Sequence, residues 1–345
     1  MISRKGLLKR TIIAHITLVM ALFSVFSLVQ PTKAANEVLG LTISPPYFEL
    51  TANPGDNLQE SIKVTNLSSD VVRYKAFVQD FKVEGTEGVV TLEDDTGSAS
   101  FSKWVTVLPA EFELNPKETR VVNYSILAPA NAEPGGHFAS VLFQPVSIAK
   151  ETSTGAQTIQ QVGALVLLNI KGNSKEGGSV EKFNSKTYNG SWEEALGSDG
   201  KTKILIAKEE DLPSEKQSKF FNNGPLAFDL LIKNSGNVHF KPVGFVTIYN
   251  IFGKQVAKLA IDPRNVFPGG ERRITVIWSK KGLWGGYYRA QVLALYGSQN
   301  QSLTAETTFF AFPTTIGIGI LIGLLLLILA RKRLAAAFRI LVKGG

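Results

Sequence analysis

A run of 22 residues without a charge, Phe309 to Ala330, constrains this chain more than any other feature of its sequence. As a helix, at 1.5 Å per residue, it would span about 33 Å, enough to cross the hydrocarbon core of a bilayer. A buried core helix of that length would need a polar face, which this run lacks. Three basic residues, Arg331 to Arg333, follow at once. Because basic residues stay on the cytoplasmic side, we predict a transmembrane helix over 309–330 and a basic cytoplasmic tail over 331–345.

The amino-terminal end carries a second membrane signal. Four basic residues in MISRKGLLKR precede 19 mostly apolar residues, Thr11 to Val29, and QPTKA follows with small residues at Thr32 and Ala34. This order is typical of an export signal, so we predict a signal peptide over 1–34 that is cleaved after Ala34. The apolar run is longer than usual, which leaves an uncleaved signal anchor as the alternative. Both ends predict a single-pass protein of the cell membrane with its body outside the cytoplasm.

The net charge of the chain comes from these two ends. The sequence has 37 Lys and Arg against 29 Asp and Glu, a formal charge of +8. Ten of the basic residues lie in 1–34 and 331–345, which contain no acid, so the remainder carries 27 basic and 29 acidic residues. The basic isoelectric point is therefore no argument for a nucleic-acid partner, and we predict none.

Between the two ends, the pattern is one of strands and turns. Runs rich in Val, Ile, Phe and Tyr, such as LTISPPYFEL, SIKVTN and GALVLLNIK, are separated by clusters of Asn, Asp, Gly, Ser and Pro. Seven runs precede residue 172, which is the strand count of one immunoglobulin-like sandwich, and five more follow a polar stretch. We predict an all-β fold of two tandem immunoglobulin-like β-sandwiches, over 35–172 and 173–308, together with the N-terminal signal helix and one C-terminal transmembrane helix. The polar stretch is predicted to be an insertion near the start of the second sandwich.

The two predicted sandwiches also resemble each other in sequence. The matches, which keep their order, are Asn66 with Asn234, Pro116 with Pro268, Arg120 with Arg272, and Gly135–Gly136 with Gly285–Gly286. An Asn can end a strand in a tight turn, a Pro can begin a strand where no amide partner is needed, and paired glycines permit positive φ angles. The matches therefore predict two copies of one folding unit.

Residue types that carry catalysis or bind metals are scarce. The chain has no Cys, which excludes thiol nucleophiles, thiolate metal sites and disulfides. Only His137 and His239 lie in the body of the chain, one in each predicted sandwich, and we interpret both as surface or packing residues. The short motifs of serine hydrolases, zinc proteases and phosphate loops do not occur. We predict that the protein is not an enzyme and has no catalytic residue, metal site or cofactor.

One stretch combines basic and aromatic side chains. We select from it a candidate ligand-contact surface of Arg272, Arg273, Trp284, Tyr287 and Arg289. Such residues can stack on sugar rings or bind anionic wall polymers and lipid head groups. The alternative is packing in a core or an interface, because aromatic residues at alternate strand positions usually face the core of a sandwich. Trp284, in a turn, is expected to be the most exposed of the set.

The order of export signal, two sandwiches, membrane helix and basic tail resembles the WxL-interacting surface proteins of Gram-positive bacteria. The resemblance is concentrated in ISPPYFELTANPGDNLQESIKVTNLSSDVVRYKAF, from Ile43 to Phe77, and in LNPKETRVVNYSILAPANAEPGGHFASVLF, from Leu114 to Phe143. It implies a first domain that contacts peptidoglycan and a second that engages a partner surface protein. The same strand, Asn and Pro-Lys-Glu-Thr patterns also look like periplasmic pilus chaperones.

These observations predict a membrane-anchored, extracytoplasmic binding or scaffold protein of the cell envelope that contacts peptidoglycan or a partner surface protein, or both. One alternative is a periplasmic-chaperone-like assembly factor, in which an open edge strand takes up an extended partner segment. Another is an envelope glycan hydrolase with paired carboxylates in a cleft. Flat exposed sheet faces would favour the scaffold, and a groove beside an edge strand would favour the chaperone.

Overall fold

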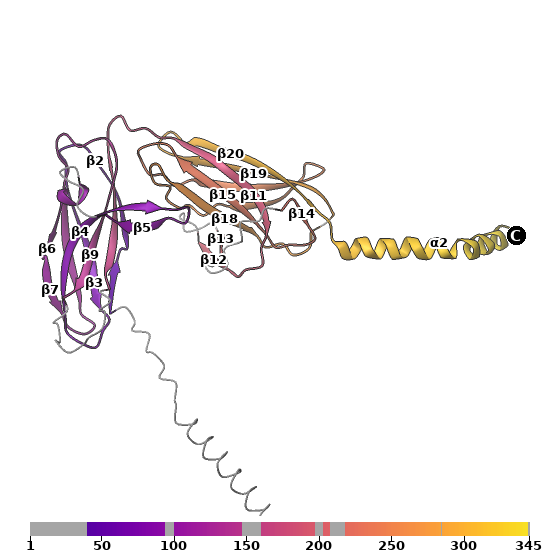
Figure 1. The fold of residues 1–345 in the computed structure, drawn as a ribbon, viewed down its shortest axis with the longest axis horizontal. Coiled ribbons are helices and arrows are strands. Elements are labelled where there is room, and N and C mark those ends of the chain that lie inside the picture. The colour runs from indigo at the N-terminus through magenta and orange to yellow at the C-terminus, as the bar shows by residue number, and fades with distance from the viewer. Residues whose placement is uncertain are drawn as a thin grey trace, which may run out of the picture.

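The computed structural model describes residues 40–93, 100–146, 160–196, 203–207, 218–283 and 285–343. These residues form two β-sandwiches followed by one apolar helix, which confirms the predicted fold class (Figure 1). The predicted signal peptide, 1–34, and Trp284 lie outside the described residues.

The first sandwich packs a four-stranded sheet against a larger one. The four-stranded sheet has the order β1 (Leu41–Ser44), β3 (Asn57–Asn66), β8 (Thr119–Leu127) and β6 (Val105–Leu108). The larger sheet has the order β2 (Tyr47–Ala52), β10 (Val162–Ile170), β9 (Gly135–Pro145), β4 (Val72–Glu84) and β5 (Val89–Leu92), with β7 (Glu111–Leu114) paired to β4. A short 3-10 helix, η1 (Phe101–Trp104), precedes β6.

The first strand region crosses from one sheet to the other. The run LTISPPYFEL forms β1, which pairs with β3, and β2, which pairs in parallel with β10. Pro45 and Pro46 separate the two strands, because a proline has no amide hydrogen for a ladder. Alternation then builds the core: in β3, Ile62 and Val64 are fully buried, whereas Ser61 is exposed.

The second sandwich has a three-stranded and a five-stranded sheet. The first has the order β11 (Gly178–Thr187), β15 (Leu226–Asn234) and β18 (Glu271–Trp278). The second has the order β14 (Phe220–Phe221), β20 (Gln301–Ala311), β19 (Gly286–Tyr296), β16 (Val243–Asn250) and β17 (Gln255–Ala260). Between β11 and β14, the predicted polar insertion forms a hairpin of β12 (Trp192–Leu196) and β13 (Lys203–Ala207).

This hairpin covers the outer face of the three-stranded sheet. Trp192 and Leu205 pack with Tyr188 on Ala227 of β15 and Ile277 of β18. With both faces covered, β15 is buried along almost its whole length, which accounts for its nearly continuous apolar sequence LAFDLLI.

A buried ion pair lies on the same face of that sheet. The ammonium group of Lys186 on β11 donates to the Asp229 carboxylate on β15, and Thr275 Oγ1 on β18 donates to the other carboxylate oxygen at 3.3 Å. Lys186 is 4% exposed and Asp229 is 8% exposed. Each charge thus depends on the other, because water does not reach either of them freely.

The helix that follows β20 is α2 (Thr314–Lys343). Its segment Thr314–Lys332 is long and apolar enough to cross a membrane, and none of it is buried against the rest of the chain. The predicted start of the helix at Phe309 is too early. Phe309 is buried and Phe310 is exposed, which is the alternation of a strand, and Pro313 then precedes the first helical turn.

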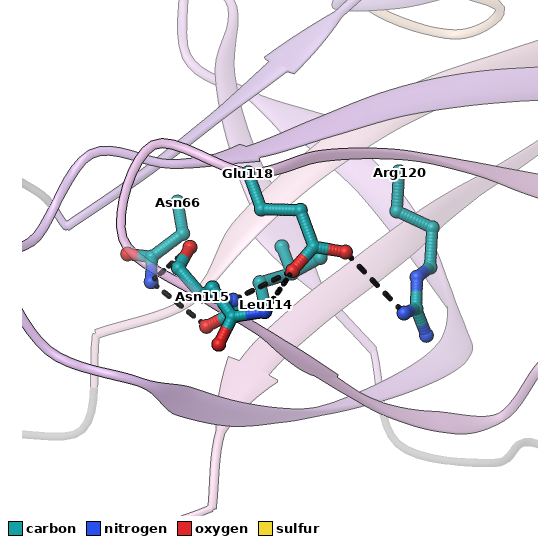
Figure 2. Close-up of polar contacts among 5 residues, drawn as sticks. All are labelled: Asn66, Leu114, Asn115, Glu118 and Arg120. Carbon is teal, nitrogen blue, oxygen red and sulfur yellow. Dashed lines mark hydrogen bonds and ion pairs between the residues drawn. The ribbon is translucent and has the colours of Figure 1, made fainter.

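The two matched asparagines occupy equivalent places in the two sandwiches. Asn66 ends β3 and Asn234 ends β15, and both are fully buried. Asn66 Nδ2 donates to the carbonyl oxygens of Leu114 at 3.1 Å, Asn115 at 3.2 Å and Asp70 at 2.8 Å. Asn234 Nδ2 makes the same kind of bonds, to Val238 at 2.8 Å and Val266 at 2.9 Å. Each amide ties the end of its strand to the loop that leads into β8 or β18; Figure 2 shows the bonds of Asn66 to Leu114 and Asn115.

The loops that these amides hold contain equivalent turns. In Asn115–Glu118 and in Phe267–Gly270, the fourth N–H donates to the first carbonyl at 3.0 Å. Both turns have proline second and a positive φ third, 63° at Lys117 and 71° at Gly269, which is the geometry of a type II turn. The double-glycine match shifts by one residue, since β9 begins at Gly135 and β19 at Gly286.

A carboxylate closes the turn of the first sandwich. Glu118 accepts bonds from the backbone N–H of Asn115 at 2.8 Å and from its side-chain amide at 2.9 Å, and the Arg120 guanidinium lies 3.4 Å away (Figure 2). The backbone bond, followed by the side-chain bond, holds the pKa of Glu118 below its usual value of 4.5. Arg120, the match of Arg272, is thus part of a turn network, and the two matched arginines have different surroundings.

Candidate binding surfaces

The residues of the predicted ligand-contact surface do not form one patch. Arg272 and Arg273 lie on β18, whereas Tyr287 and Arg289 lie on β19 in the opposite sheet. The two pairs are therefore separated by the core of the second sandwich, a separation that their nearness in sequence did not reveal. Trp284 lies outside the described residues.

Arg272 and Arg273 contact the first sandwich. The β4–β5 hairpin extends from that sandwich towards the second (Figure 1). The backbone N–H of Arg273 donates to the Thr86 carbonyl at 2.8 Å, and its Nε lies 3.6 Å from the Glu87 carboxylate. The Arg272 guanidinium lies against Gly88, where an added Cβ would come within 1.2 Å of Nη1. Both arginines therefore pack in an interface, which was the alternative to the predicted contact with a ligand.

A second set of polar contacts joins the sandwiches at the strand ends. Glu49 of β2 pairs with Lys241 and accepts a bond from Asn265 at 3.1 Å. Burial acts to raise the pKa of Glu49, but the bonds from Lys241 and Asn265 outweigh it and hold the pKa below 4.5. The backbone carbonyl of Asn237 accepts a bond from the Gly136 N–H at 2.8 Å, and its side-chain amide donates to the Pro134 carbonyl at 2.9 Å.

An aromatic cluster fills the space between these contacts. Phe138 of the first sandwich lies edge-on to Phe267 of the second, with ring centroids 5.0 Å apart, and to His239 at 5.5 Å. Phe81 adds a further edge contact with Phe267 at 6.1 Å. Edge-to-face pairs of this kind add to the hydrophobic gain of burying the rings. Together with the polar contacts, they dock the two sandwiches on each other.

The docked interface is expected to weaken on mild acidification because of His239. Burial lowers the pKa of His239 below 6.5; the Glu49 carboxylate opposes this shift and the Lys241 ammonium adds to it. The unfolded chain therefore binds the proton first, so stability falls as the pH drops below about 6.5 and levels off below the folded-state pKa. The thermal midpoint should decrease between pH 7.5 and 5.5.

The variant His239→Gln should lose this part of the pH dependence, and His137→Gln should keep it. His137 packs on Trp104, with centroids 4.6 Å apart, and its Nε2 lies 2.9 Å from the Glu133 carbonyl. An equal decrease in wild type and His239→Gln would contradict the assignment. Over this range Glu49 stays ionised, because its pKa is lowered from a value already below the range.

Tyr287 and Arg289 lie on the outer face of the five-stranded sheet. Both are exposed, and the Arg289 guanidinium lies 5.4 Å from the centre of the Tyr249 ring on β16. Next to them is a shallow depression of about 510 Å³, lined by Thr247, Tyr249, Gln291, Val292, Leu293, Thr304, Ala305 and Glu306. Beyond it, towards the first sandwich, four exposed apolar residues form what we term the apolar patch: Val243, Phe245, Leu293 and Leu295.

The outer face of the four-stranded sheet in the first sandwich has polar side chains at its centre and the exposed Leu108, Val121 and Leu127 beside them. Gln59 and Ser61 of β3 lie opposite Ser125 and Asn123 of β8, and Thr106 of β6 lies opposite Ser125. We term these five residues the polar face. It is hollowed by a depression of about 500 Å³, whose lining also includes Glu60, Leu108 and Tyr124. Sequence reasoning missed the polar face, although the outward positions of QESIKV and VVNYS already carry its residues.

The described residues offer no group of three or more His, Asp or Glu side chains placed to hold a metal ion. The two histidines of the body are both used in packing, as the preceding contacts show. The described surfaces offer hydrogen-bonding groups beside the exposed Leu108, Val121 and Leu127 on the first sandwich, and a contiguous apolar patch on the second.

No protein-family model matches the chain, and no curated protein matches it. Solved structures that are similar include the class 5 fimbriae chaperone CfaA, at 12% identity and a TM-score of 0.36, covering 78% of this chain and 98% of that one. A second is the CsuC–CsuE chaperone–tip adhesion subunit complex from Acinetobacter baumannii, at 10% identity and a TM-score of 0.32, covering 77% and 97%. A third is the E. coli chaperone DraB, at 12% identity and a TM-score of 0.31, covering 79% and 96%. The likeness concerns the β-sandwich fold.

Proposed function

We propose that the chain is a membrane-tethered, non-enzymatic binding protein of the cell envelope, in which the first sandwich contacts a cell-wall polymer and the second engages a partner surface protein. This is the division of roles that the resemblance to WxL-interacting proteins implies. The observation that carries the proposal is the difference between the two outer faces: one has neutral hydrogen-bonding groups at its centre with the exposed Leu108, Val121 and Leu127 around them, and the other has a continuous apolar patch.

The polar face suits a glycan strand with peptide branches. Its hydroxyl and carboxamide groups both donate and accept hydrogen bonds, as the hydroxyl and amide groups of peptidoglycan do. Neighbouring strands bring these groups to spacings of about 5 Å across the face, so that an extended polymer can make several bonds at once. Such contacts bind without a deep cleft, in agreement with the shallow depression on this face.

The apolar patch suits a protein partner. Val243, Phe245, Leu293 and Leu295 are neighbours across β16 and β19, since Val243 pairs with Leu295 and Phe245 with Leu293. Contiguous exposed apolar residues with polar neighbours are typical of protein–protein interfaces. Thr247, Gln291 and Glu306 supply such neighbours at one side of the patch.

Anchoring by α2 completes the proposal. Arg331 and Lys332 lie at the carboxyl end of the apolar segment, which favours a cytoplasmic carboxyl end and an extracytoplasmic pair of sandwiches. A protein held at the cell membrane in this way meets its envelope partners at a raised effective concentration.

The test is co-sedimentation of the full chain in detergent with isolated cell-wall sacculi. The double variant Gln59→Ala with Asn123→Ala should bind roughly thirtyfold more weakly, because two neutral hydrogen bonds are worth about 1 kcal/mol each and every 1.4 kcal/mol is a factor of ten. The matched control is Gln291→Ala, which removes an amide from the outer face of the second sandwich and should bind as wild type does. Absence of saturable binding by the wild-type chain would refute the polymer contact.

The second candidate is an assembly chaperone, the kind of protein found in the similar solved structures. The observation that favours it is β6, which ends the order of its sheet beside the depression on the polar face. An extended segment of a client protein would add to this edge as a further strand. Strand β10 is less suited, since it already pairs with β2 and β9. Two results together would favour this candidate. The chain would not bind to sacculi in the sedimentation test, and a cross-linker placed on β6 would capture an envelope protein in a separate experiment.

A further inference from the structure

Strand pairing brings three segments together at the end of the second sandwich from which α2 leaves (Figure 1). Tyr288 of β19 lies opposite Asn250 of β16 on one side and opposite Phe309 of β20 on the other. The β16–β17 turn, 251–254, therefore projects beyond the row of residues at which β20 approaches the helix. Adjacent strands are about 4.8 Å apart, so the turn lies roughly 10 Å across the sheet from the start of the helix.

The helix is tied to this end of the sandwich. The Phe312 N–H donates to the Phe221 carbonyl at 2.8 Å, and the Thr314 N–H donates to Asn222 Oδ1 at 2.6 Å. The Phe312 ring packs closely against Gly285 and Gly317. A Cβ added at Gly285 would lie 3.0 Å from the ring, and one added at Gly317 would lie 2.6 Å from it. The orientation of the sandwich is thus coupled to that of α2.

The same end carries the most exposed large apolar side chain of the two described sandwiches. Phe252, at the tip of the β16–β17 turn, is 89% exposed, and Ile251 beside it is 64% exposed. Phe220, Tyr287 and Phe310 are also exposed; Phe220 and Phe310 stack with centroids 5.7 Å apart, and Tyr287 pairs with Phe310 across β19 and β20. Bulky apolar side chains that project from a tip into water are unfavourable, and such patches are typical of surfaces that contact a protein or a membrane.

Basic residues surround these apolar groups. Lys219, Lys254, Lys280 and Lys281 are all exposed. The segments 218–228, 279–290 and 307–330, which meet at this end, contain no Asp or Glu. The charge therefore matches an anionic surface.

We propose that this end of the second sandwich docks on the phospholipid bilayer that α2 crosses, with Ile251 and Phe252 inserted among the lipids and the four lysines against anionic head groups. Only Phe312 and Pro313 separate β20 from the first helical residue, a connection of at most about 7–10 Å. The polar interfacial layer is about 5–8 Å thick on each side of the hydrocarbon core, so the aromatic groups lie at its level. Aromatic and basic side chains are the residue types that favour this layer.

The proposal rests on the anchoring by α2, and the experiment tests the two separately. Since the chain has no Cys, single substitutions can each carry one fluorophore without further changes. The full chain is placed in nanodiscs that contain phosphatidylglycerol and phosphatidylcholine, some bearing a spin label near the head group or in mid-chain. The labelled positions are Phe252→Cys and Tyr287→Cys at the proposed surface, Leu324→Cys within α2, and Val243→Cys and Leu293→Cys as controls on the same sheet.

Head-group spin labels should quench the fluorophores at 252 and 287 roughly threefold more strongly than those at 243 and 293. The controls lie about 20 Å further along the strands. Equal quenching at both ends, with Leu324→Cys quenched by mid-chain labels, would overturn the docking and leave the anchor in place. Absence of quenching at 324 would refute the anchor itself.

A second measurement addresses the lysines. In nanodiscs of phosphatidylcholine alone, quenching at 287 should decrease, and the charge reversal Lys280→Glu with Lys281→Glu should produce the same decrease in mixed nanodiscs. Unchanged quenching in both cases would contradict a role for anionic head groups. The lysines are exposed, so the reversal is expected to leave folding intact.

Discussion

Replacement of Asp229 by alanine is expected to lower the free energy of unfolding of the second sandwich by about 3–5 kcal/mol. The change leaves the Lys186 ammonium, which is 4% exposed, without its carboxylate on the sheet face against which the β12–β13 hairpin packs. It also removes the acceptor of the Thr275 hydroxyl. A buried charge that has lost its partner retains its desolvation cost, and this is among the largest effects that a single substitution can have.

Denaturant unfolding of the full chain, followed by tryptophan fluorescence to which the buried Trp278 contributes, measures this loss. The matched control is Arg73→Ala, which breaks an exposed ion pair with Glu113 and should cost less than about 1 kcal/mol. The double variant Lys186→Met with Asp229→Leu should recover most of the loss, because it removes both charges and keeps the volume. A cost for Asp229→Ala as small as that of the control would contradict the burial of this pair.

Replacement of Asn66 by alanine is expected to cost the first sandwich about 2–4 kcal/mol. The amide donates to three carbonyls, and its Oδ1 accepts bonds from the backbone N–H and the hydroxyl of Ser68. Without it, the carbonyl of the fully buried Leu114 loses this donor in a place that water does not reach. The loop between β7 and β8 should also lose protection from hydrogen exchange.

Two further variants make this prediction specific. Asn66→Asp should be no better than alanine, because an ionised carboxylate accepts hydrogen bonds and cannot donate to the carbonyls. Asn57→Ala changes an exposed asparagine at the other end of β3 and should alter stability by less than about 0.5 kcal/mol. Comparable costs for Asn57→Ala and Asn66→Ala would show that the buried amide is not a specific anchor.

The class of the fold could be predicted because its signals are local. Strand runs, turn residues and the uncharged run before Arg331 each depend on a few neighbouring residues. The matched pair Asn66 and Asn234 was also visible, and the structure gives both side chains the same role of tying a strand end to a distant loop. The sequence did not show that Phe309 belongs to a strand and not to the helix, because apolar strands and apolar helices have similar composition.

The predicted ligand-contact surface could not be placed from the sequence, because its residues are adjacent in the chain and far apart in the fold. Whether Arg273 faces solvent depends on the β4–β5 hairpin, which lies almost two hundred residues earlier in the chain. The same applies to the polar insertion: its hairpin packs on the sheet face that holds Lys186 and Asp229, and no local pattern indicates that these charged residues of two strands are buried. The polar face was missed because neutral outward residues are the ordinary content of exposed strands.

In the proposed membrane-anchored protein, the bonds that tie α2 to Asn222 and Phe221 and the docked interface between the sandwiches link the bilayer to the polar face. On this proposal, these contacts set the height of the polar face above the membrane. A polymer or protein can occupy both sandwiches at once only if its own sites lie at that height, so the thickness of the layer next to the membrane selects among partners of equal affinity. Partner choice then depends on distance as well as on surface chemistry.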